Sequence, residues 1–307
     1  MSAPPKVSVV IPTRRRPASL ERAVRSVFAQ EGLNPRQIEL VIADNDADRG
    51  AARIAEVLAK DSPFSLHYVC EPTPGVASAR NAALAKARGA LIAFLDDDEE
   101  ASPGWLAALL DAQKRFDADA VFGPVRGAAP ADIRRHRDYL ERFFSREGPA
   151  EAGVIDRSYG CGNSLVRRSA LPHPTAPFAL SQNQLGGEDD LLFQEMETAG
   201  ARFAWAPAAW VWEHPDPARL TLAYAMRRAF AYGQGPTQAA AARTPFDASG
   251  VAVWMAKGAV QTVGYGAVAA GKWLAHRPDR ADALDRAVRG LGKVLWFKPF
   301  QAKLYGA

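Results

Sequence analysis

Short apolar runs alternate with helix-length stretches over the first 125 residues, and this alternation constrains the fold more than any other feature. The apolar runs have the length of β-strands and cover residues 7–11, 38–43, 66–70, 90–95 and 121–125. The intervening stretches have helical character and cover residues 17–30, 51–60, 76–88 and the segment after 102. Such alternation is typical of βαβ units. The sequence therefore predicts an α/β fold with a Rossmann-like, mainly parallel sheet flanked by helices.

Length and composition fit an ordinary globular protein. The 307 residues suffice for two domains, or for one large α/β domain with an extension. A hydrophobic content of 48% with 23% charged residues excludes a collagen-like or disordered chain. Cys70 and Cys161 are too few for a disulfide framework, which favours a reducing compartment. The N-terminal segment lacks the basic and long apolar regions of a signal peptide, so we expect none.

Ligands of parallel sheets bind beyond the carboxyl ends of the strands, so the residues after each strand are the first functional candidates. Asp96, Asp97 and Asp98 directly follow an apolar strand. Three adjacent carboxylates repel one another unless a cation neutralises them. Oxygen ligands of this kind suit Mg²⁺ or Mn²⁺, with substrate phosphates completing the shell. We therefore expect a divalent-cation site here, with a solvated acidic loop as the alternative.

A second acidic cluster, Gly-Gly-Glu-Asp-Asp at residues 186–190, opens a predicted helix that ends near Gly200. Acidic residues at a helix N-terminus also cap the helix and complement its dipole, so a purely structural role explains them as well. The two glycines allow a substrate to approach the backbone closely. This second feature favours a functional role.

Seven segments together resemble the inverting glycosyltransferases of family 2, which have the GT-A fold. They are VSVVIPTRRRPASL, ELVIADNDAD, PTPGVASARNAAL, LIAFLDDDEEASPGWL, GCGNSLVRRSAL, GGEDDLLFQEMETAG and VWEHPDPARLTLAYAMRRAFAYGQG, spanning about residues 6–235. The resemblance implies a GT-A fold with a mixed, mainly parallel sheet. It also implies transfer of a sugar, a hexose or an N-acetylhexosamine, from a nucleotide-sugar donor. UDP-sugars are the expected donors.

The resemblance also assigns the donor-binding residues. Asp44 corresponds to the residue that hydrogen-bonds the nucleobase. Four further residues correspond to positions that line the nucleotide pocket: Pro12, Thr13, Arg80 and Asn81.

In the DxD motif of the family, Asp96 corresponds to the residue nearer the ribose and Asp98 to the ligand of the Mg²⁺ or Mn²⁺ that bridges the phosphates. Asp97 is the variable middle residue, which belongs to the donor side and is expected to face water. His214 matches a histidine that approaches the metal or phosphates in relatives. A buried histidine without such a role is the alternative.

Inversion requires a base that takes the proton of the acceptor hydroxyl on the face opposite the leaving group. In the family this base is the Asp of a Glu-Asp motif, which maps to Asp189. Glu188 then orients the acceptor, and Asp190 caps the helix.

Two other functions fit parts of the pattern. A sugar-1-phosphate nucleotidyltransferase shares a related sheet, but its first strand precedes a glycine-rich loop, and IPTRRRPASL contains no glycine. A non-catalytic nucleotide- or carbohydrate-binding scaffold would be free to lose Asp98 or Asp189, and both are present. Relatives often carry Asn before the Arg of the first motif. Here residues 14–16 are all arginine, which we interpret as a solvated basic turn, with extra guanidinium groups near the pyrophosphate as the alternative.

We expect a catalytic domain over residues 1–240, with a nucleotide-binding half at about 1–125 and an acceptor half at about 126–240. A helical extension follows at 241–307. Within it, residues 258–271 are uncharged but shorter than a membrane span of about 20 residues. Residues 282–300 are predicted to form a basic amphipathic helix with Leu284, Val288, Leu291 and Leu295 on one stripe.

Charge is concentrated at the C-terminal end. Residues 276–307 hold seven basic and three acidic residues, which equals the net charge of +4 of the whole chain. The near-neutral remainder argues against nucleic acid as a partner. The basic helix either packs onto the catalytic domain or lies on an anionic membrane surface. We expect the protein to be cytoplasmic, with peripheral contact to the inner membrane as one option. Its expected acceptor is a saccharide or lipid-linked saccharide of bacterial polysaccharide biosynthesis.

Overall fold

The computed structural model describes residues 5–183 and 186–300. Contacts divide the chain into two compact units. Unit 1 comprises Met1–Ala128 and Phe144–His214, and unit 2 comprises Ala129–Phe143 and Pro215–Ala307. The domain boundary that the sequence places near residue 240 stays a prediction.

Within the described residues of unit 1, an eight-stranded sheet has the order β3-β2-β1-β4-β9-β6-β10-β8. Its strands are β1 (Val7–Thr13), β2 (Ile38–Asp44), β3 (Ser65–Cys70), β4 (Leu91–Phe94), β6 (Ala120–Phe122), β8 (Gly153–Ile155), β9 (Ser164–Arg167) and β10 (Phe203–Trp205). Strands β1, β2, β3 and β4 pair in parallel, whereas β9 is antiparallel to β4 and β6, and β8 to β10. The predicted mixed, mainly parallel sheet is confirmed.

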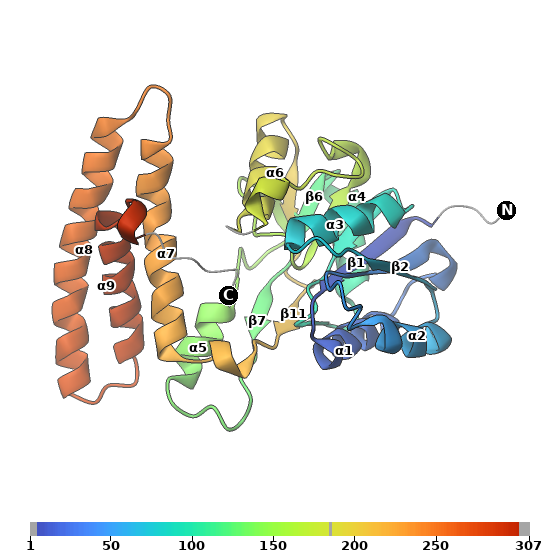
Figure 1. Cartoon of the computed structure of the whole chain (residues 1–307), viewed down its shortest axis with the longest axis horizontal. Coiled ribbons are helices and arrows are strands. Elements are labelled where there is room, and N and C mark those ends of the chain that lie inside the picture. Colours follow the sequence, from blue (N-terminus) through green and yellow to red (C-terminus); the bar gives the residue numbers. More distant parts are fainter. Residues whose placement is uncertain (1–4, 184–185, 301–307) are drawn as a thin grey trace. The chain divides into compact units, whose positions relative to one another are not determined.

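Helices cover both faces of this sheet. On one face, α1 (Pro17–Phe28), α2 (Ala52–Asp61) and α4 (Trp105–Phe116) bury apolar side chains such as Leu20, Leu58 and Leu106 against the strands. On the other face, α3 (Val76–Lys86) and α6 (Glu188–Thr198) contribute residues such as Leu84 and Phe193 to a second core (Figure 1). Because both faces are covered, β1 and β2 are buried along their whole length.

The strand order creates a topological switch point between β1 and β4. The chain moves outward from β1 to β2 and β3, and then returns to place β4 on the other side of β1. Helices that connect strands on opposite sides of such a point leave a crevice at the carboxyl ends of the strands. The last residues of β1 and β2, Thr13 and Asp44, are partners in register at this edge.

The prediction of one strand over residues 121–125 is only partly right. Strand β6 ends at Phe122, and β7 (Val125–Gly127) belongs to a separate three-stranded sheet of order β5-β11-β7. Pro124 separates them, since proline lacks the N–H needed for a central ladder. The other strands of this sheet are β5 (Glu99–Ala101), which the sequence analysis missed, and β11 (Val211–Glu213).

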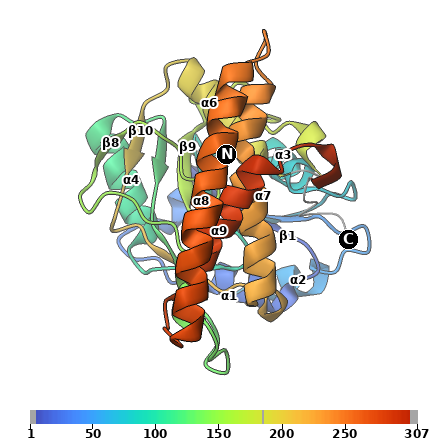
Figure 2. The ribbon, with the colours of Figure 1, turned by 90° about the vertical axis from the view of Figure 1, so that its left-hand side faces the viewer.

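The described part of unit 2 is helical. Its helices are α5 (Arg137–Phe144, whose last residue falls in unit 1), α7 (Leu222–Ala241), α8 (Ala248–Leu274) and α9 (Arg280–Val294). Helices α7, α8 and α9 run side by side, and α9 packs against both others (Figure 2). Gly258 of α8 and Gly290 of α9 let the two backbones touch, because a Cβ at Gly290 would lie 2.7 Å from the carbonyl oxygen of Gly258. Within residues 5–183 and 186–300, no helix combines the length and apolar character needed to cross a membrane.

The predicted basic helix differs in length and orientation. Helix α9 ends at Val294, six residues earlier than expected, and a separate 3-10 turn covers Lys298–Phe300. Its buried residues are small, Ala281, Ala283, Ala287, Gly290 and Gly292 among them, whereas Leu291 of the predicted apolar stripe is 38% exposed. The close contact with α7 and α8 selects small side chains over the leucine stripe.

Candidate active site

The residues that end β1 and follow β4 meet in the crevice. Thr13 Oγ1 donates a 2.8 Å hydrogen bond to Asp97 Oδ2, and Pro12 precedes Thr13 within the buried strand. Asp97 is only 6% exposed, so the expectation that this middle residue faces water is wrong. Burial, and then the charge of Asp98, raise the pKa of Asp97 to about 6. The turn after β4 therefore directs Asp97 into the site.

Arg16 contacts the same turn. Its Nη1 lies 3.2 Å from Asp97 Oδ1 and 3.2 Å from Asp98 Oδ2, and its side chain is 35% exposed. The interpretation of residues 14–16 as a solvated turn thus fails for Arg16. The structure places this arginine, just before α1, at the acidic motif.

Asp44 lies at the end of β2 and is fully buried. Its Oδ2 accepts hydrogen bonds from the Ala51 N–H at 2.9 Å and from the Tyr68 hydroxyl at 2.7 Å. Its Oδ1 is buried without a hydrogen-bond partner. A buried carboxylate oxygen of this kind is costly unless a donor reaches it.

Arg80 connects the two acidic clusters. It projects from α3, is 4% exposed, and its Nη2 lies 3.1 Å from Asp96 Oδ1. Its Nη1 pairs with Glu188 Oε1 at the start of α6. Burial raises the pKa of Glu188, and the charge of Arg80 opposes this rise. One buried guanidinium thus holds both clusters in a single network.

The segment of residues 160–163 forms a second connection between these clusters. The Cys161 N–H donates a 3.0 Å hydrogen bond to Asp189 Oδ2. Next to it, a Cβ at Gly162 would lie 2.5 Å from Asp96 Oδ2, so this position accepts no side chain without a shift. The Gly-Cys-Gly-Asn motif belongs to the resemblance, which assigns no role to these residues.

Glu99 supports the acidic turn through a hydrogen bond to the Asp96 backbone, a role that the sequence does not predict. It is 1% exposed, and its Oε2 accepts a 3.0 Å hydrogen bond from the Asp96 N–H. Arg146 pairs with its Oε1 at 3.2 Å. Burial, and then the charge of Asp96, hold the pKa of Glu99 well above its usual range. Five consecutive acidic residues after a strand, 96–100, were the available signal, but only the pairing with Arg146 reveals that Glu99 points inward.

Asn81 and His214, which are predicted to line the nucleotide pocket and to approach the metal, make contacts with other protein groups. The Asn81 side chain exchanges hydrogen bonds of 2.8 and 3.0 Å with the backbone of Phe178. The His214 backbone N–H donates to the Asp98 carbonyl at 2.8 Å, while its Nε2 lies 2.9 Å from Glu100 Oε2. His214 is therefore adjacent to the acidic turn, and the nucleotide and metal roles predicted for these residues stay predictions.

The donor set at the turn fits a divalent cation that shares its shell with a ligand. Two carboxylate oxygens, from Asp97 and Asp98, converge on one nitrogen of Arg16 and so lie close to each other. In the described ranges, no group of three or more His, Cys, Asp or Glu side chains is arranged to hold a metal by itself. A hard cation such as Mg²⁺ commonly binds through one or two carboxylates and completes its shell with phosphates and water.

The mainly parallel sheet, with an acidic turn after β4 and a second acidic cluster at the start of α6, is the fold of the GT-A class of glycosyltransferases. The sequence matches Glycosyl transferase family 2 over residues 8–173, more than half of the chain, so this protein belongs to that family. The fold and the resemblance predicted from the sequence are confirmed.

Relatives support the same assignment. The chain is 36% identical to the succinoglycan biosynthesis protein ExoM of Rhizobium meliloti over 231 residues, 74% of this chain and 73% of ExoM. It is 31% identical to a GalNAc(5)-diNAcBac-PP-undecaprenol beta-1,3-glucosyltransferase of Campylobacter jejuni, over 39% of this chain and 38% of that one.

Solved structures share the fold at low identity. The mannosyltransferase PcManGT of Pyrobaculum calidifontis, in complex with GDP-Man and Mn²⁺, matches with a TM-score of 0.63 and 18% identity, covering 96% of this chain and 88% of its own. TarS 1-349 of S. aureus in complex with UDP matches with a TM-score of 0.53 and 18% identity, covering 72% and 63%.

Proposed function

We propose that this protein is a divalent-cation-dependent, inverting glycosyltransferase that moves a sugar from a UDP-sugar to a saccharide acceptor in bacterial exopolysaccharide biosynthesis. The main support is the network that joins the acidic turn after β4 to the start of α6. Arg80 contacts Asp96 and Glu188, and residues 160–163 contact Asp96 and Asp189. Such a network holds the groups for the donor and for the acceptor at a fixed spacing, as a transfer reaction requires.

The donor side is built from strand ends. The partnerless Asp44 Oδ1 suits an N–H donor such as the one on a uracil ring, which supports a uridine nucleotide. Asp97 and Asp98 would hold Mg²⁺ or Mn²⁺ together with the diphosphate. When bound, the cation neutralises the charge that grows on the diphosphate leaving group.

The acceptor side centres on Asp189 at the start of α6. Its two oxygens accept hydrogen bonds from the N–H groups of Cys161 and Asp190, which fix the carboxylate in orientation. An acceptor hydroxyl is a weak acid, so a positioned carboxylate takes its proton as the new bond forms. Glu188, held by Arg80, would orient the acceptor.

The acceptor that we propose is a lipid-linked saccharide, as the name of the Campylobacter jejuni relative indicates for that enzyme. Helix α8 of unit 2 offers a surface for a lipid bilayer. Five aliphatic side chains on this helix are exposed, Val253 at 49%, Val260 at 76%, Val263 at 74%, Val268 at 45% and Leu274 at 84%. The helix carries two lysines and no acidic residue.

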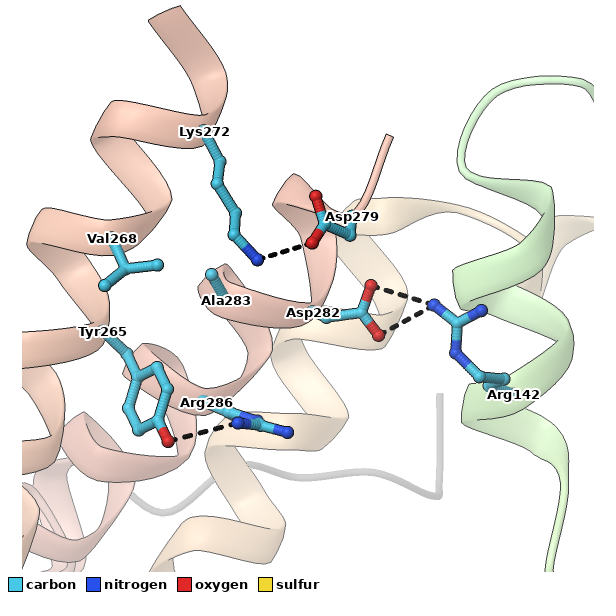
Figure 3. A pocket seen from close by; sticks show the side chains of 8 residues that line it. All are labelled: Arg142, Tyr265, Val268, Lys272, Asp279, Asp282, Ala283 and Arg286. Carbon is cyan, nitrogen blue, oxygen red and sulfur yellow. Dashed lines mark hydrogen bonds and ion pairs between the residues drawn. The ribbon is translucent and has the colours of Figure 1, made fainter. Parts of the chain in front are cut away.

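Basic side chains lie beside this apolar surface. A groove of about 290 Å³ next to α8 contains Lys272, paired with Asp279, and Arg142, paired with Asp282 (Figure 3). Arg286 in the same groove contacts the hydroxyl of Tyr265 at 3.1 Å. The groove thus has an excess of positive charge, which complements the anionic headgroups of a bilayer surface. We propose peripheral binding of α8 to the cytoplasmic face of an anionic membrane.

A donor screen tests the proposed activity. Purified protein is incubated with UDP-, GDP- and dTDP-sugars, with Mg²⁺, Mn²⁺ or EDTA, and release of the nucleotide is measured. We expect release from a UDP-sugar that requires the cation, and an inverted anomeric configuration in the transferred sugar by NMR. Release of pyrophosphate from a sugar-1-phosphate and UTP would instead identify a nucleotidyltransferase.

A further inference from the structure

The guanidinium of Arg16 lies between the two carboxylates that the proposed function gives to a divalent cation. A single nitrogen, Nη1, is 3.2 Å from both Asp97 Oδ1 and Asp98 Oδ2. Thr13 holds the other oxygen of Asp97 at 2.8 Å, so the carboxylate is fixed while it contacts Arg16. The acidic turn therefore already has a positively charged partner from the protein.

This contact has two physical consequences. Adjacent carboxylates repel each other, and a guanidinium between them stabilises the turn. A divalent cation that binds the same two oxygens must displace the guanidinium, because two positive groups at one place repel strongly. The Arg16 side chain can move, since it is 35% exposed and its backbone lies just before α1.

We propose that Arg16 is an internal counter-ion that competes with the divalent cation for Asp97 and Asp98 and, once displaced, binds the donor diphosphate. The inference rests on the proposed cation-dependent transfer. A guanidinium binds phosphate oxygens in pairs, so the diphosphate offers Arg16 an alternative partner. Cation and nucleotide consequently bind cooperatively. The cation releases Arg16 from the two carboxylates so that it can bind the diphosphate, and the diphosphate keeps Arg16 away from the carboxylates that bind the cation.

Calorimetric titration of the 307-residue chain with Mn²⁺, without nucleotide, tests this competition directly. We expect R16Q to bind Mn²⁺ about tenfold more tightly than the wild type, since the competing charge is gone. R16K keeps a positive charge at the site and should bind Mn²⁺ as the wild type does. R14Q is the matched control. Arg14 is exposed, and its substitution removes the same charge two residues away, so the affinity of R14Q for Mn²⁺ should stay within about twofold of the wild type.

Nucleotide binding in excess Mn²⁺ tests the second half. The affinity of R16Q for UDP should fall about tenfold, while R14Q stays close to the wild type. Opposite changes for Mn²⁺ and UDP are not expected from a general loss of structure, and melting curves check the fold of each variant.

Each outcome decides the proposal. Unchanged or weaker Mn²⁺ binding by R16Q, beside measurable binding by the wild type, overturns the role of Arg16 and leaves the cation-dependent function intact. Absence of Mn²⁺ binding in both proteins, with and without UDP, overturns both. Binding by R16Q alone supports the competition in its strongest form.

Discussion

Gly162 lies against Asp96 so closely that a methyl group on its Cα would come within 2.5 Å of Asp96 Oδ2. The same Cβ would lie 3.0 Å from Glu99 Oε1. This contact places the backbone between β8 and β9 directly beside the acidic turn after β4. The turn is thus supported by main chain as well as by side chains.

Gly162→Ala should displace Asp96 and impair donor binding. We expect the affinity for UDP in Mn²⁺ to fall at least about tenfold, because a Cβ there overlaps two carboxylates and overpacking of this kind shifts the side chains around it. Calorimetry measures the affinity. Gly153→Ala is the control, since a Cβ at Gly153 meets nothing within 4 Å. Equal UDP affinity in the two variants would contradict the role given to residues 160–163.

Asp189→Asn should separate donor binding from chemistry. The amide keeps the size of the carboxylate but cannot take the acceptor proton, so we expect UDP affinity close to wild type and transfer slower by about 10²–10⁴-fold. Asp190→Asn, the adjacent residue, should retain most activity. Transfer at wild-type rate by the Asp189 variant would exclude it as the base.

Asp98→Ala should remove the effect of Mn²⁺ on donor binding. The cation and the diphosphate bind together, so the loss of one ligand carboxylate should abolish the difference in UDP affinity between Mn²⁺ and EDTA. Asp48→Ala, which removes an exposed carboxylate close to Arg15, is the control. A variant at Asp98 that still binds UDP more tightly with Mn²⁺ would refute the assignment of this ligand.

The buried contacts of the Glu39 carboxylate predict that the free energy of unfolding depends on pH. Burial raises the pKa of Glu39, but hydrogen bonds from Ser8 and from the backbone and side chain of Arg88 outweigh burial and hold the pKa below its usual value. A lowered folded-state pKa stabilises the protein above the unfolded pKa of about 4.3, and this contribution is lost as the pH falls through the folded value.

Glu39→Gln should therefore lower the free energy of unfolding at pH 7 by about 1–3 kcal/mol, since a charged acceptor of several hydrogen bonds is lost. The difference should shrink as the pH falls below the unfolded pKa of about 4.3 and through the lower folded-state pKa, because protonated Glu39 resembles glutamine. Urea unfolding from pH 3.5 to 7 measures it. Glu56→Gln on the exposed surface of α2 should change little at any pH. A difference independent of pH would show that the charge of Glu39 is not the cause.

The aliphatic surface of α8 predicts membrane binding. The double variant Val260→Asp, Val263→Asp should lose most of its co-sedimentation with phosphatidylglycerol vesicles, because two charges replace apolar side chains in the contact. Val57→Asp, on a 44% exposed valine of α2, should bind as the wild type does. Salt should weaken wild-type binding, as screening shortens the reach of the lipid charge. Concentration-dependent dimers that the double variant disrupts, without vesicle binding, would instead identify α8 as a contact between two copies.

The sequence by itself determined the architecture of the first half of the chain. Strand and helix periodicity are local properties, so β1, β2, β3 and β4 were predicted within two residues at each end. The rule that parallel strands bind ligands at their carboxyl ends then pointed to Thr13, Asp44 and residues 96–98. These positions depend on the order of elements along the chain, which the sequence contains.

Only the tertiary structure decided which polar groups meet. Arg16 and Asp97 are 81 positions apart, and Arg80 and Glu188 are 108 apart. No local pattern encodes such pairs, because they arise when the sheet brings distant turns to one edge. For the same reason, the inward orientation of Glu99 and the burial of small residues on α9 could not be predicted. Periodicity shows which side of an element is apolar, whereas the neighbouring elements decide which side is covered.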